Sequence, residues 1–308
     1  MISFAVFGQG QVVHGYNDAQ KAMDYFNKGA EKAKAEKYKE AINDFDKAIA
    51  LDKTLSEFYY NRGFCEVKLN DYEAAIPDFN MAIKLRNKTF TDALFYRGYC
   101  YNKIKMYVPA ISDFTKALEV SSTSQLWSER GYAYFQTQDY ENAVSDYTNA
   151  IAMDSKNIEL VGLRALCQYQ LHHLKESIED ADKYLSVKPE SPDILVVEIK
   201  AKCELKDNEG AYETALKMLK VQKSPTSYYY MGLTEFYTKK YKEGITDFSK
   251  VIQFDARYRE AYYGRALCYL GLNDDDHACP DLRKAAELGY PNLVGRIEDY
   301  CKGVNEGK

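Results

Sequence analysis

The residues that could carry out chemistry in this chain are few. Its 308 residues include four histidines: His14 near the N-terminus, the adjacent pair His172 and His173, and His277 after three aspartates at 274–276. Such an acidic run could hold a divalent cation, but aspartates there also cap the free amides of a helix. No zinc-type Cys/His spacing, glycine-rich phosphate loop or nucleophile–base–acid set can be assembled. The sequence therefore predicts no metal, no cofactor and no enzymatic activity.

Six of the seven cysteines fall into two groups. Four recur at one position of the repeat described below, which favours packing of a small buried side chain over reactivity: Cys65, Cys100, Cys167 and Cys268. Cys279 and Cys301 lie close to the C-terminus in neighbouring predicted helices. In an exported protein they could form a disulfide that holds the end of the fold together. Their oxidation state stays open.

Composition excludes several classes of protein. Apolar residues make up 46% and charged residues 28%, as in a folded, well-packed chain. The net charge is −5 with dispersed Lys and Arg, so no nucleic-acid footprint is predicted. No apolar run approaches the roughly 18 residues of a membrane span. The N-terminal MISFAVFGQGQ resembles the end of a secretory signal without its basic region. It slightly favours an exported or periplasmic location over a cytoplasmic one.

One phrase recurs along the chain, as in DYEAAIPDFNMAI (71–83), DYENAVSDYTNAI (139–151) and KYKEGITDFSKVI (240–252). Its small residue recurs every 33 to 35 residues: Ala41, Ala75, Ala110, Ala143, Ser177, Ala211, Gly244 and Ala278. Within each copy the apolar spacing of i, i+3, i+4 and i+7 indicates a helix. A second helical stretch precedes it, across a short polar turn. This period is typical of stacked helix–turn–helix units.

The repeat carries a family resemblance. Small residues recur at positions 8 and 20, an aromatic residue at 4, Phe or Tyr at 24 and Ala at 27. In the second copy these are Tyr59, Gly63, Ala75, Phe79 and Ala82. The pattern, which extends from residue 22 to about 292, resembles the tetratricopeptide repeat family. The resemblance implies an all-α, right-handed α-solenoid: a superhelix of antiparallel helix pairs that usually binds peptides or proteins along its concave face.

The expected organisation has three parts. Residues 1–21 form an N-terminal segment, either the remnant of a signal peptide with a linker or an apolar tail. Eight repeats follow: 22–55, 56–90, 91–123, 124–157, 158–191, 192–224, 225–258 and 259–292. Residues 293–308 are expected to form a capping helix and tail. In repeats 5 and 6 positions 24 and 27 exchange a large for a small residue, with Ala181 before Tyr184 and Ala215 before Met218, which conserves core volume.

A cation at position 7 faces an aspartate at position 23 across the turn of most repeats. We interpret these residues as structural ion pairs rather than anion ligands: Arg62–Asp78, Arg97–Asp113, Arg130–Asp146, Arg164–Asp180 and Arg265–Asp281. Lys28 and Asp44 hold the two positions in repeat 1. In repeat 6 both are replaced, by Glu198 and Thr214, whereas repeat 7 keeps an aspartate opposite Met231.

In the family, positions 2, 5, 9, 12 and 13 of the first helix line the concave groove. Here they are rich in aromatic residues, which we predict to bind a partner: Phe26, Tyr60, Phe64, Phe95, Tyr99, Tyr132, Phe135, Tyr169, Tyr229, Phe236, Tyr237 and Tyr263. Tyrosine combines stiff contact area with a polar tip, which suits an extended ligand. Alternatively, the rings pack on one another and partly close the groove.

The function expected from these features is a non-catalytic protein–protein interaction scaffold, or adaptor, that binds a peptide segment or a partner protein. Two alternatives stay open: binding of a glycan or another small ligand by the same aromatic residues, and a structural subunit of a larger assembly. The sequence specifies neither the identity of the partner nor the oligomeric state.

Overall fold

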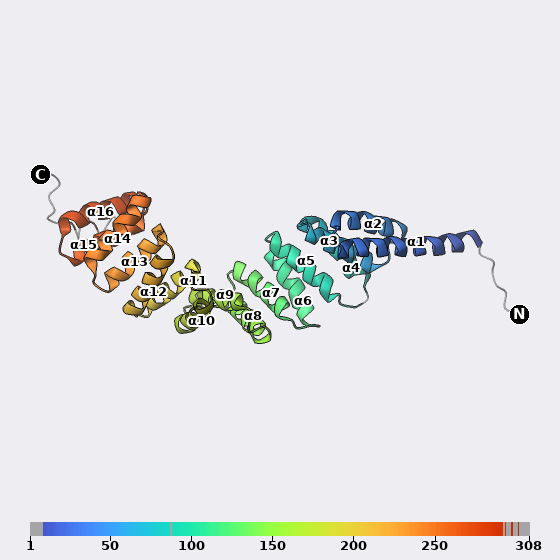
Figure 1. Cartoon of the computed structure of the whole chain (residues 1–308), viewed down its shortest axis with the longest axis horizontal. Helices are drawn as coiled ribbons and strands as arrows, with labels where there is room; N and C mark the ends of the chain where they lie inside the picture. Colours follow the sequence, from blue (N-terminus) through green and yellow to red (C-terminus); the bar gives the residue numbers. More distant parts are fainter. Residues whose placement is uncertain (1–8, 87, 292, 294–296, 298–300, 302–308) are drawn as a thin grey trace. The chain divides into compact units, whose positions relative to one another are not determined.

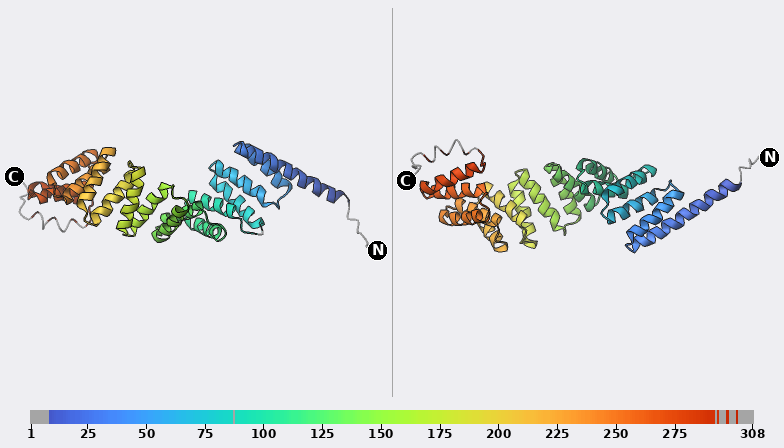
Figure 2. Two further views of the ribbon diagram at one scale, coloured as in Figure 1. Left: turned by 60° about the horizontal axis from the view of Figure 1, so that its bottom comes forward. Right: turned by 90° about the horizontal axis from the view of Figure 1, so that it is seen from above.

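The computed structural model describes residues 9–86 and 88–291, together with Leu293, Ile297 and Cys301, and the side chains from residue 17 onward. The protein is an all-α solenoid. Over the described residues, sixteen helices follow one another in eight pairs and no strand is formed (Figure 1). The further views in Figure 2 show the two helices of a pair running side by side.

The chain divides into two compact units of four repeats each, residues 1–156 and 157–308. Unit 1 contains α1 (Gln9–Lys34), α2 (Tyr38–Leu51), α3 (Ser56–Lys68), α4 (Tyr72–Leu85), α5 (Thr91–Lys103), α6 (Tyr107–Leu118), α7 (Ser124–Gln136) and α8 (Tyr140–Met153). Unit 2 contains α9 (Ile158–Gln170), α10 (Leu174–Val187), α11 (Pro192–Glu204), α12 (Asn208–Val221), α13 (Pro225–Tyr237), α14 (Tyr241–Phe254), α15 (Arg259–Gly271) and α16 (Asp275–Glu287). Odd-numbered helices are the first helices of their repeats.

The turn between the two helices has the same construction in every repeat. Its residue at position 15 has a positive φ between 56° and 63°, which ends the first helix in the left-handed conformation: Glu36, Asn70, Lys105, Gln138, His172, Lys206, Lys239 and Asn273. The next residue caps the second helix where it is an aspartate, as when Asp139 accepts a hydrogen bond from the backbone N–H of Asn142. A sharp, rigid reversal results.

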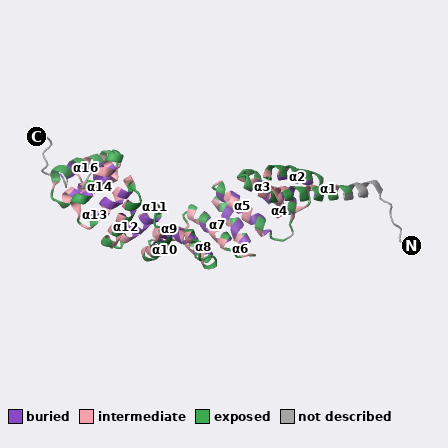
Figure 3. Cartoon of the chain, viewed as in Figure 1, coloured by how far each residue is buried: buried purple, intermediate pink, exposed green. Residues whose placement is uncertain are grey.

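In most repeats a glycine in the first helix allows close contact with the second helix. A Cβ atom added at Gly98 would lie only 2.9 Å from the Phe114 ring of the second helix. In repeat 5 the large residue has moved to Tyr184, and the glycine it packs against is Gly162 at position 5. Exchange of large and small residues thus keeps the helices paired. Buried residues follow these contact faces in both units (Figure 3).

The N-terminal end differs from the sequence-based expectation in detail. Helix α1 begins at Gln9, so residues 9–21, which the repeat pattern leaves in the N-terminal segment, continue the first helix without a break. No proline or turn signal interrupts that stretch. Residues 1–8 and most of the expected capping segment, 293–308, lie outside the described residues. Within that segment Ile297 N–H donates to the Leu293 carbonyl and Cys301 N–H to the Ile297 carbonyl, at helical spacing.

Candidate functional site

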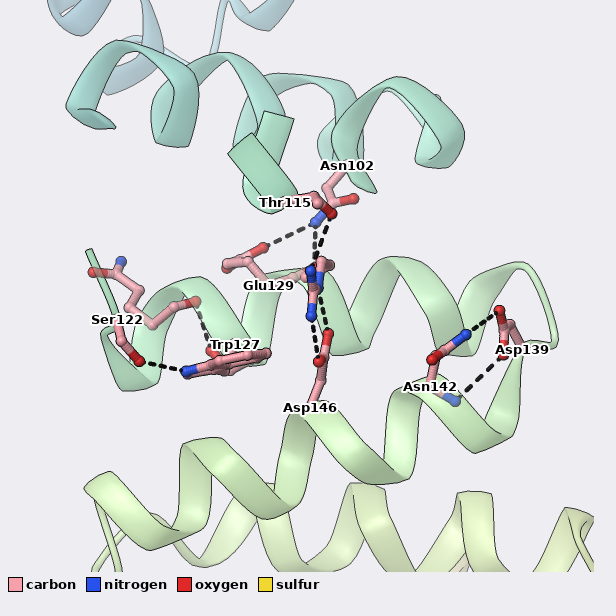
Figure 4. Close-up of polar contacts among 11 residues, drawn as sticks. Asn102, Thr115, Ser122, Trp127, Glu129, Asp139, Asn142 and Asp146 are labelled. Atoms are coloured by element: carbon pink, nitrogen blue, oxygen red, sulfur yellow. Dashed lines mark hydrogen bonds and ion pairs between the residues drawn. The ribbon is translucent and has the colours of Figure 1, made fainter. Parts of the chain in front are cut away.

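Four of the five predicted arginines, Arg62, Arg97, Arg130 and Arg265, each join three helices rather than two. In repeat 4 the Arg130 Nε and Nη2 atoms donate to the two carboxylate oxygens of Asp146, both at 2.8 Å. Its Nη1 atom donates to Thr115 of the preceding repeat at 3.0 Å. Thr115 and Asp146 face each other across this contact (Figure 4). The hydrogen bonds to Asp146 raise the pKa of Arg130. We call this arrangement the arginine staple.

The other four pairs have the same bidentate geometry, with both nitrogen–oxygen distances between 2.6 and 2.8 Å: Arg62–Asp78, Arg97–Asp113, Arg164–Asp180 and Arg265–Asp281. Three of them also reach position 25 of the preceding repeat, through Arg62–Asp46, Arg97–Asn80 and Arg265–Ser249. The aspartates at position 23 are buried. These guanidinium groups therefore have structural partners within the fold.

The pair expected between Lys28 and Asp44 is replaced by a different contact. Asp44 is bound by Lys32, one helical turn later, at 2.5 Å, whereas the Lys28 Nζ atom lies 5.5 Å from the Tyr25 ring centroid. Lysine lacks the several fixed N–H donors with which a guanidinium group bridges two helices. The contact with Asp44 is therefore made by Lys32, at position 11, and not by the residue at position 7.

Repeats 6 and 7 replace the staple in different ways. In repeat 6 the carboxylate of Glu198 accepts hydrogen bonds from Lys202 and, at 2.7 Å, from the Thr214 hydroxyl. In repeat 7 Met231 joins an apolar cluster that includes Leu216, which occupies position 25 of the preceding repeat. The matching aspartate of repeat 7, Asp247, accepts from Lys250 at 2.6 Å instead.

The arginine-free repeat 7 contains a buried acid. Glu235 lies one turn after Met231, is 4% exposed, and its Oε2 atom has no hydrogen-bond partner. Burial, then repulsion by Asp247 and Glu243, raises its pKa to about 8. Glu66 holds the same position in repeat 2, where Arg62 is present, and its pKa is raised to about 7, again mainly by burial.

In unit 1 the predicted aromatic residues lie along the first helices at partial burial. Phe26, Tyr60, Phe64, Phe95, Tyr99 and Phe135 are half-buried, and Tyr132 is 37% exposed. Their rings contact neighbouring aromatic rings: Tyr99 lies 6.1 Å from Tyr72 and 6.3 Å from Phe95, and Tyr132 lies 6.3 Å from Tyr107. We call this surface the first-helix face of unit 1. Its rings pack on one another yet remain accessible.

A pocket of about 330 Å³ opens among these rings. It is lined by residues of repeats 2, 3 and 4: Val67, Lys68, Asn70, Tyr72, Phe95, Tyr96, Tyr99 and Gln125. Phe95 and Tyr99 were expected in the groove. Tyr72 and Tyr96 were not, although Tyr96 contacts Phe64 of the preceding repeat with ring centroids 5.2 Å apart.

The signal for Tyr72 was present in the sequence. The first residue of the second helix, position 17, is a tyrosine in five repeats: Tyr38, Tyr72, Tyr107, Tyr140 and Tyr241. In four of these repeats the ring meets an aromatic ring of a first helix, as in the Tyr107–Tyr132 and Phe236–Tyr241 contacts. Position 17 lies on the second helix, outside the first-helix positions predicted to line the groove.

In unit 2 the predicted aromatic residues also make internal contacts. The Tyr169 hydroxyl donates to Glu204 at 2.7 Å. Tyr229 packs against Phe248 and Tyr258, with ring centroids 6.0 and 5.4 Å away. Phe236 contacts Tyr237 and Tyr241, and Tyr263 stacks on Tyr290 at 4.3 Å. Among these five, Tyr237 is the most accessible, with 42% of its surface exposed.

Comparison with known families now identifies the fold. Tetratricopeptide repeat models match residues 25–55, 56–88, 92–124, 124–157 and 260–288, which together make up about half of the chain. The chain belongs to the tetratricopeptide repeat family. Repeats 5 to 7 lie outside the matched segments, where Tyr184, Met218 and Met231 depart from the repeat pattern. Their helices, α9 to α14, still form the same pairs.

Solved tetratricopeptide structures share the fold at low sequence identity. A tetratricopeptide repeat protein from Parabacteroides merdae is 19% identical, with a TM-score of 0.54, over 80% of this chain and 97% of that one. The C-terminal part of a repeat-containing protein from Cytophaga hutchinsonii is 17% identical, with a TM-score of 0.62, over 78% and 98%. YrrB, described as having an unusual peptide-binding site, is 20% identical, with a TM-score of 0.55, over 58% and 93%. The comparison with curated proteins finds no match.

The cysteines of this tetratricopeptide array do not form a reactive centre. Cys65, Cys100, Cys167 and Cys268 are buried, and burial raises the pKa of each thiol to about 12. Cys203 is partly exposed, and burial raises its pKa to about 11. Thiolates are therefore disfavoured near neutral pH. Cys279 and Cys301 form a disulfide, with their Cα atoms 5.8 Å apart.

The histidine beside the three aspartates belongs to a helix cap. Asp274 accepts a hydrogen bond from the backbone N–H of His277, and the His277 Nδ1 atom lies 2.8 Å from the same carboxylate. Over the part of the chain that the structure describes, no three His, Cys, Asp or Glu side chains are placed to hold a metal ion. Nor does any described helix have the length and apolar character of a membrane span.

Proposed function

We propose that the protein is a non-catalytic scaffold whose first-helix face in unit 1 binds a peptide segment or an extended part of a partner protein. Tetratricopeptide repeat proteins are generally protein-interaction scaffolds. The observation that carries the proposal is the pocket lined by residues of repeats 2, 3 and 4. It has a volume of about 330 Å³ and combines four aromatic rings with polar groups from Lys68, Asn70 and Gln125, so that it could hold an anchor side chain of a partner and hydrogen-bond its backbone.

Three further features support peptide binding. Tyr132, on the first helix of repeat 4, keeps 37% of its surface exposed. Ring–ring contacts fix the orientation of Tyr99 and Phe95, so that binding orders few additional side chains. A protein of the same fold, YrrB, is described as having a peptide-binding site.

Site-specific photocrosslinking tests the location of binding. A photoreactive phenylalanine analogue replaces Phe95 or Tyr132 in the full chain, and Asn149, exposed on the second helix α8, serves as the matched control position. Irradiation in native extract is expected to give discrete adducts from the two groove positions and none from position 149. Equal adduct patterns at all three positions, or none at the groove positions, would refute binding at this face.

A second arm separates binding from folding. The double variant Tyr99→Ala/Tyr132→Ala is expected to lose the crosslink at position 95 while keeping its helical circular dichroism signal. Because the two rings also contact Tyr72 and Tyr107, urea unfolding is measured in parallel. Two results together would show that the rings only pack the core. The double variant would be strongly destabilised, and the chain that keeps Tyr99 and Tyr132 would give no adducts from position 95.

A further inference from the structure

A row of lysines borders the first-helix face in repeats 1 to 3. Position 13, in the last turn of the first helix, is Lys34, Lys68 and Lys103 in these repeats, and all three are exposed. The Lys68 Nζ atom lies 5.2 Å from the centroid of the Phe64 ring, and the Lys103 Nζ atom lies 4.9 Å from that of Tyr99. Two of the lysines therefore lie directly over rings of the proposed binding face. We call these three residues the lysine edge.

Helix stability alone does not account for the lysine edge. A cation near a helix C-terminus does interact favourably with the helix dipole. However, the last turns of α7, α9, α13 and α15 contain no basic residue, and these first helices form equally well. Position 13 of the later repeats is Gln136, Gln170, Glu204, Tyr237 and Gly271. The lysines are thus a property of repeats 1 to 3, two of which, repeats 2 and 3, also contribute most of the pocket lining.

Charged residues of opposite sign lie on opposite sides of the pocket. Of its eight lining residues only Lys68 is charged. The opposite ends of the first helices carry acids at position 2, the exposed Glu57 of α3 and Asp92 of α5. The aromatic floor therefore has a basic border on one side and an acidic border on the other. A ligand with acids along one edge would complement this pattern, because unlike charges then face each other.

We propose that the occupant of this face is an extended acidic peptide segment, with an aromatic or bulky apolar side chain in the pocket and Asp or Glu carboxylates on Lys68 and Lys103. This inference rests on the proposed function and specifies its ligand. Packed helices lie about 8–10 Å apart, and an extended chain rises about 3.3 Å per residue. Acidic residues spaced about three apart would therefore meet lysines of successive repeats.

The test uses a defined probe and the full chain. The probe is a fluorescein-labelled peptide, Glu-Ser-Phe-Glu-Ser-Phe-Glu, whose acids recur every third residue, and binding is followed by fluorescence anisotropy. One control peptide replaces Glu by Lys and a second replaces Glu by Gln. The acidic peptide is expected to bind at least about tenfold more tightly than either control at low salt, and to weaken as salt rises. Equal or tighter binding of either control would overturn the inference.

A charge-reversal pair locates the contact. Lys68→Glu/Lys103→Glu is compared with Lys84→Glu/Lys116→Glu, which changes the net charge equally on exposed residues of the second helices α4 and α6. The first variant is expected to weaken the acidic peptide by about tenfold and to improve binding of the lysine peptide. The second is expected to leave both within about twofold. Equal losses in the two variants would mean that overall charge, and not the lysine edge, governs binding.

Failure of this inference is distinguishable from failure of the proposed function. If the glutamine peptide binds as well as the acidic one, and groove crosslinks persist in Lys68→Glu/Lys103→Glu, the face binds peptides without the acidic preference. If none of the peptides binds but crosslinks are found, the ligand is of another chemistry and the acidic assignment is wrong. If crosslinks at positions 95 and 132 are also absent, both proposals fail.

Discussion

Repeats 4 and 7 form the same helix pair with different chemistry. In repeat 4 Arg130 links its own second helix to the preceding repeat through hydrogen bonds to Asp146 and Thr115. In repeat 7 the corresponding link is apolar, with Met231 and Leu216 in one buried cluster. Buried ion pairs can often be replaced by apolar residues of similar volume without loss of stability. The fold therefore depends on filling this position and not on the charge itself.

The exchange has a consequence for the acids that remain. Without an arginine, Lys250 pairs with Asp247, and the charges of Lys250 and Lys240 only partly offset the effects of burial and repulsion, which raise the pKa of Glu235 to about 8. Repeat 2 is the natural reference, because there Arg62 lowers the pKa of the equivalent Glu66, which rises only to about 7. Both repeats thus contain a buried acid with a raised pKa, and the pKa is higher in the repeat without the arginine.

The largest expected effect is removal of a staple arginine. Arg130→Ala leaves Asp146 unpaired at 2% exposure, and we expect a loss of about 3–5 kcal/mol in the free energy of unfolding, measured with urea through the fluorescence of Trp127. The double variant Arg130→Met/Asp146→Leu, which imitates the apolar link of repeat 7, should recover most of the loss. A loss below about 1 kcal/mol for the single variant would mean that the staple is dispensable even where its aspartate remains.

A smaller effect is expected from pH. The folded state raises the pKa of Glu235 above its ordinary value, so its contribution is complete below about pH 4.5 and is lost as pH rises towards 8. At about 1.4 kcal/mol per pKa unit, the loss amounts to at most about 5 kcal/mol. Hydrogen exchange of the α13 and α14 amides, corrected for intrinsic rates, measures it. Glu235→Gln should abolish this slope, whereas Glu66→Gln should leave it unchanged; a slope that persists in Glu235→Gln would assign it to another group.

The smallest expected effect comes from restoring a staple in repeat 7. In Met231→Arg/Leu216→Thr the new guanidinium should pair with Asp247 and approach the hydroxyl introduced at position 216, as Arg130 does with Asp146 and Thr115. The pKa of Glu235 should then fall by about one unit, towards that of Glu66, which corresponds to about 1.4 kcal/mol. A carbon-13 titration of the Glu235 carboxyl measures the change. A pKa that stays near 8 would show that the arginine does not control it.

Much of the architecture is predictable from the sequence because the fold is repetitive. The 33- to 35-residue period, the small residues such as Gly98 and the aromatic residues such as Phe114 are local patterns, and their packing partners lie within the same or the next repeat. The arginine contacts with Asp78 and its equivalents follow from symmetry about the turn. What symmetry does not reveal is the third partner, such as Thr115, since position 25 varies among Asp, Asn, Thr and Ser.

The binding face is less predictable for a physical reason. Helical phase places Phe95 and Tyr99 on the first-helix face, but how far a ring is covered depends on neighbours from other helices. Tyr72 and Tyr96 also line the pocket, from positions 17 and 6, which the repeat pattern does not place in the groove. How far the rings are covered decides whether they form a binding surface or an internal contact. Because this coverage depends on neighbours from other repeats, the pattern of a single repeat does not predict it.

The disulfide between Cys279 and Cys301 also determines how the oxidised protein would respond to a mechanical load. Tension applied at the two chain ends would enter at Cys301 and cross the covalent bond directly to Cys279. Residues 280–300, including most of α16, would then bear no force. A pulling experiment should therefore release about 20 fewer residues of contour length than the same chain under reducing conditions, about 70 Å at full extension.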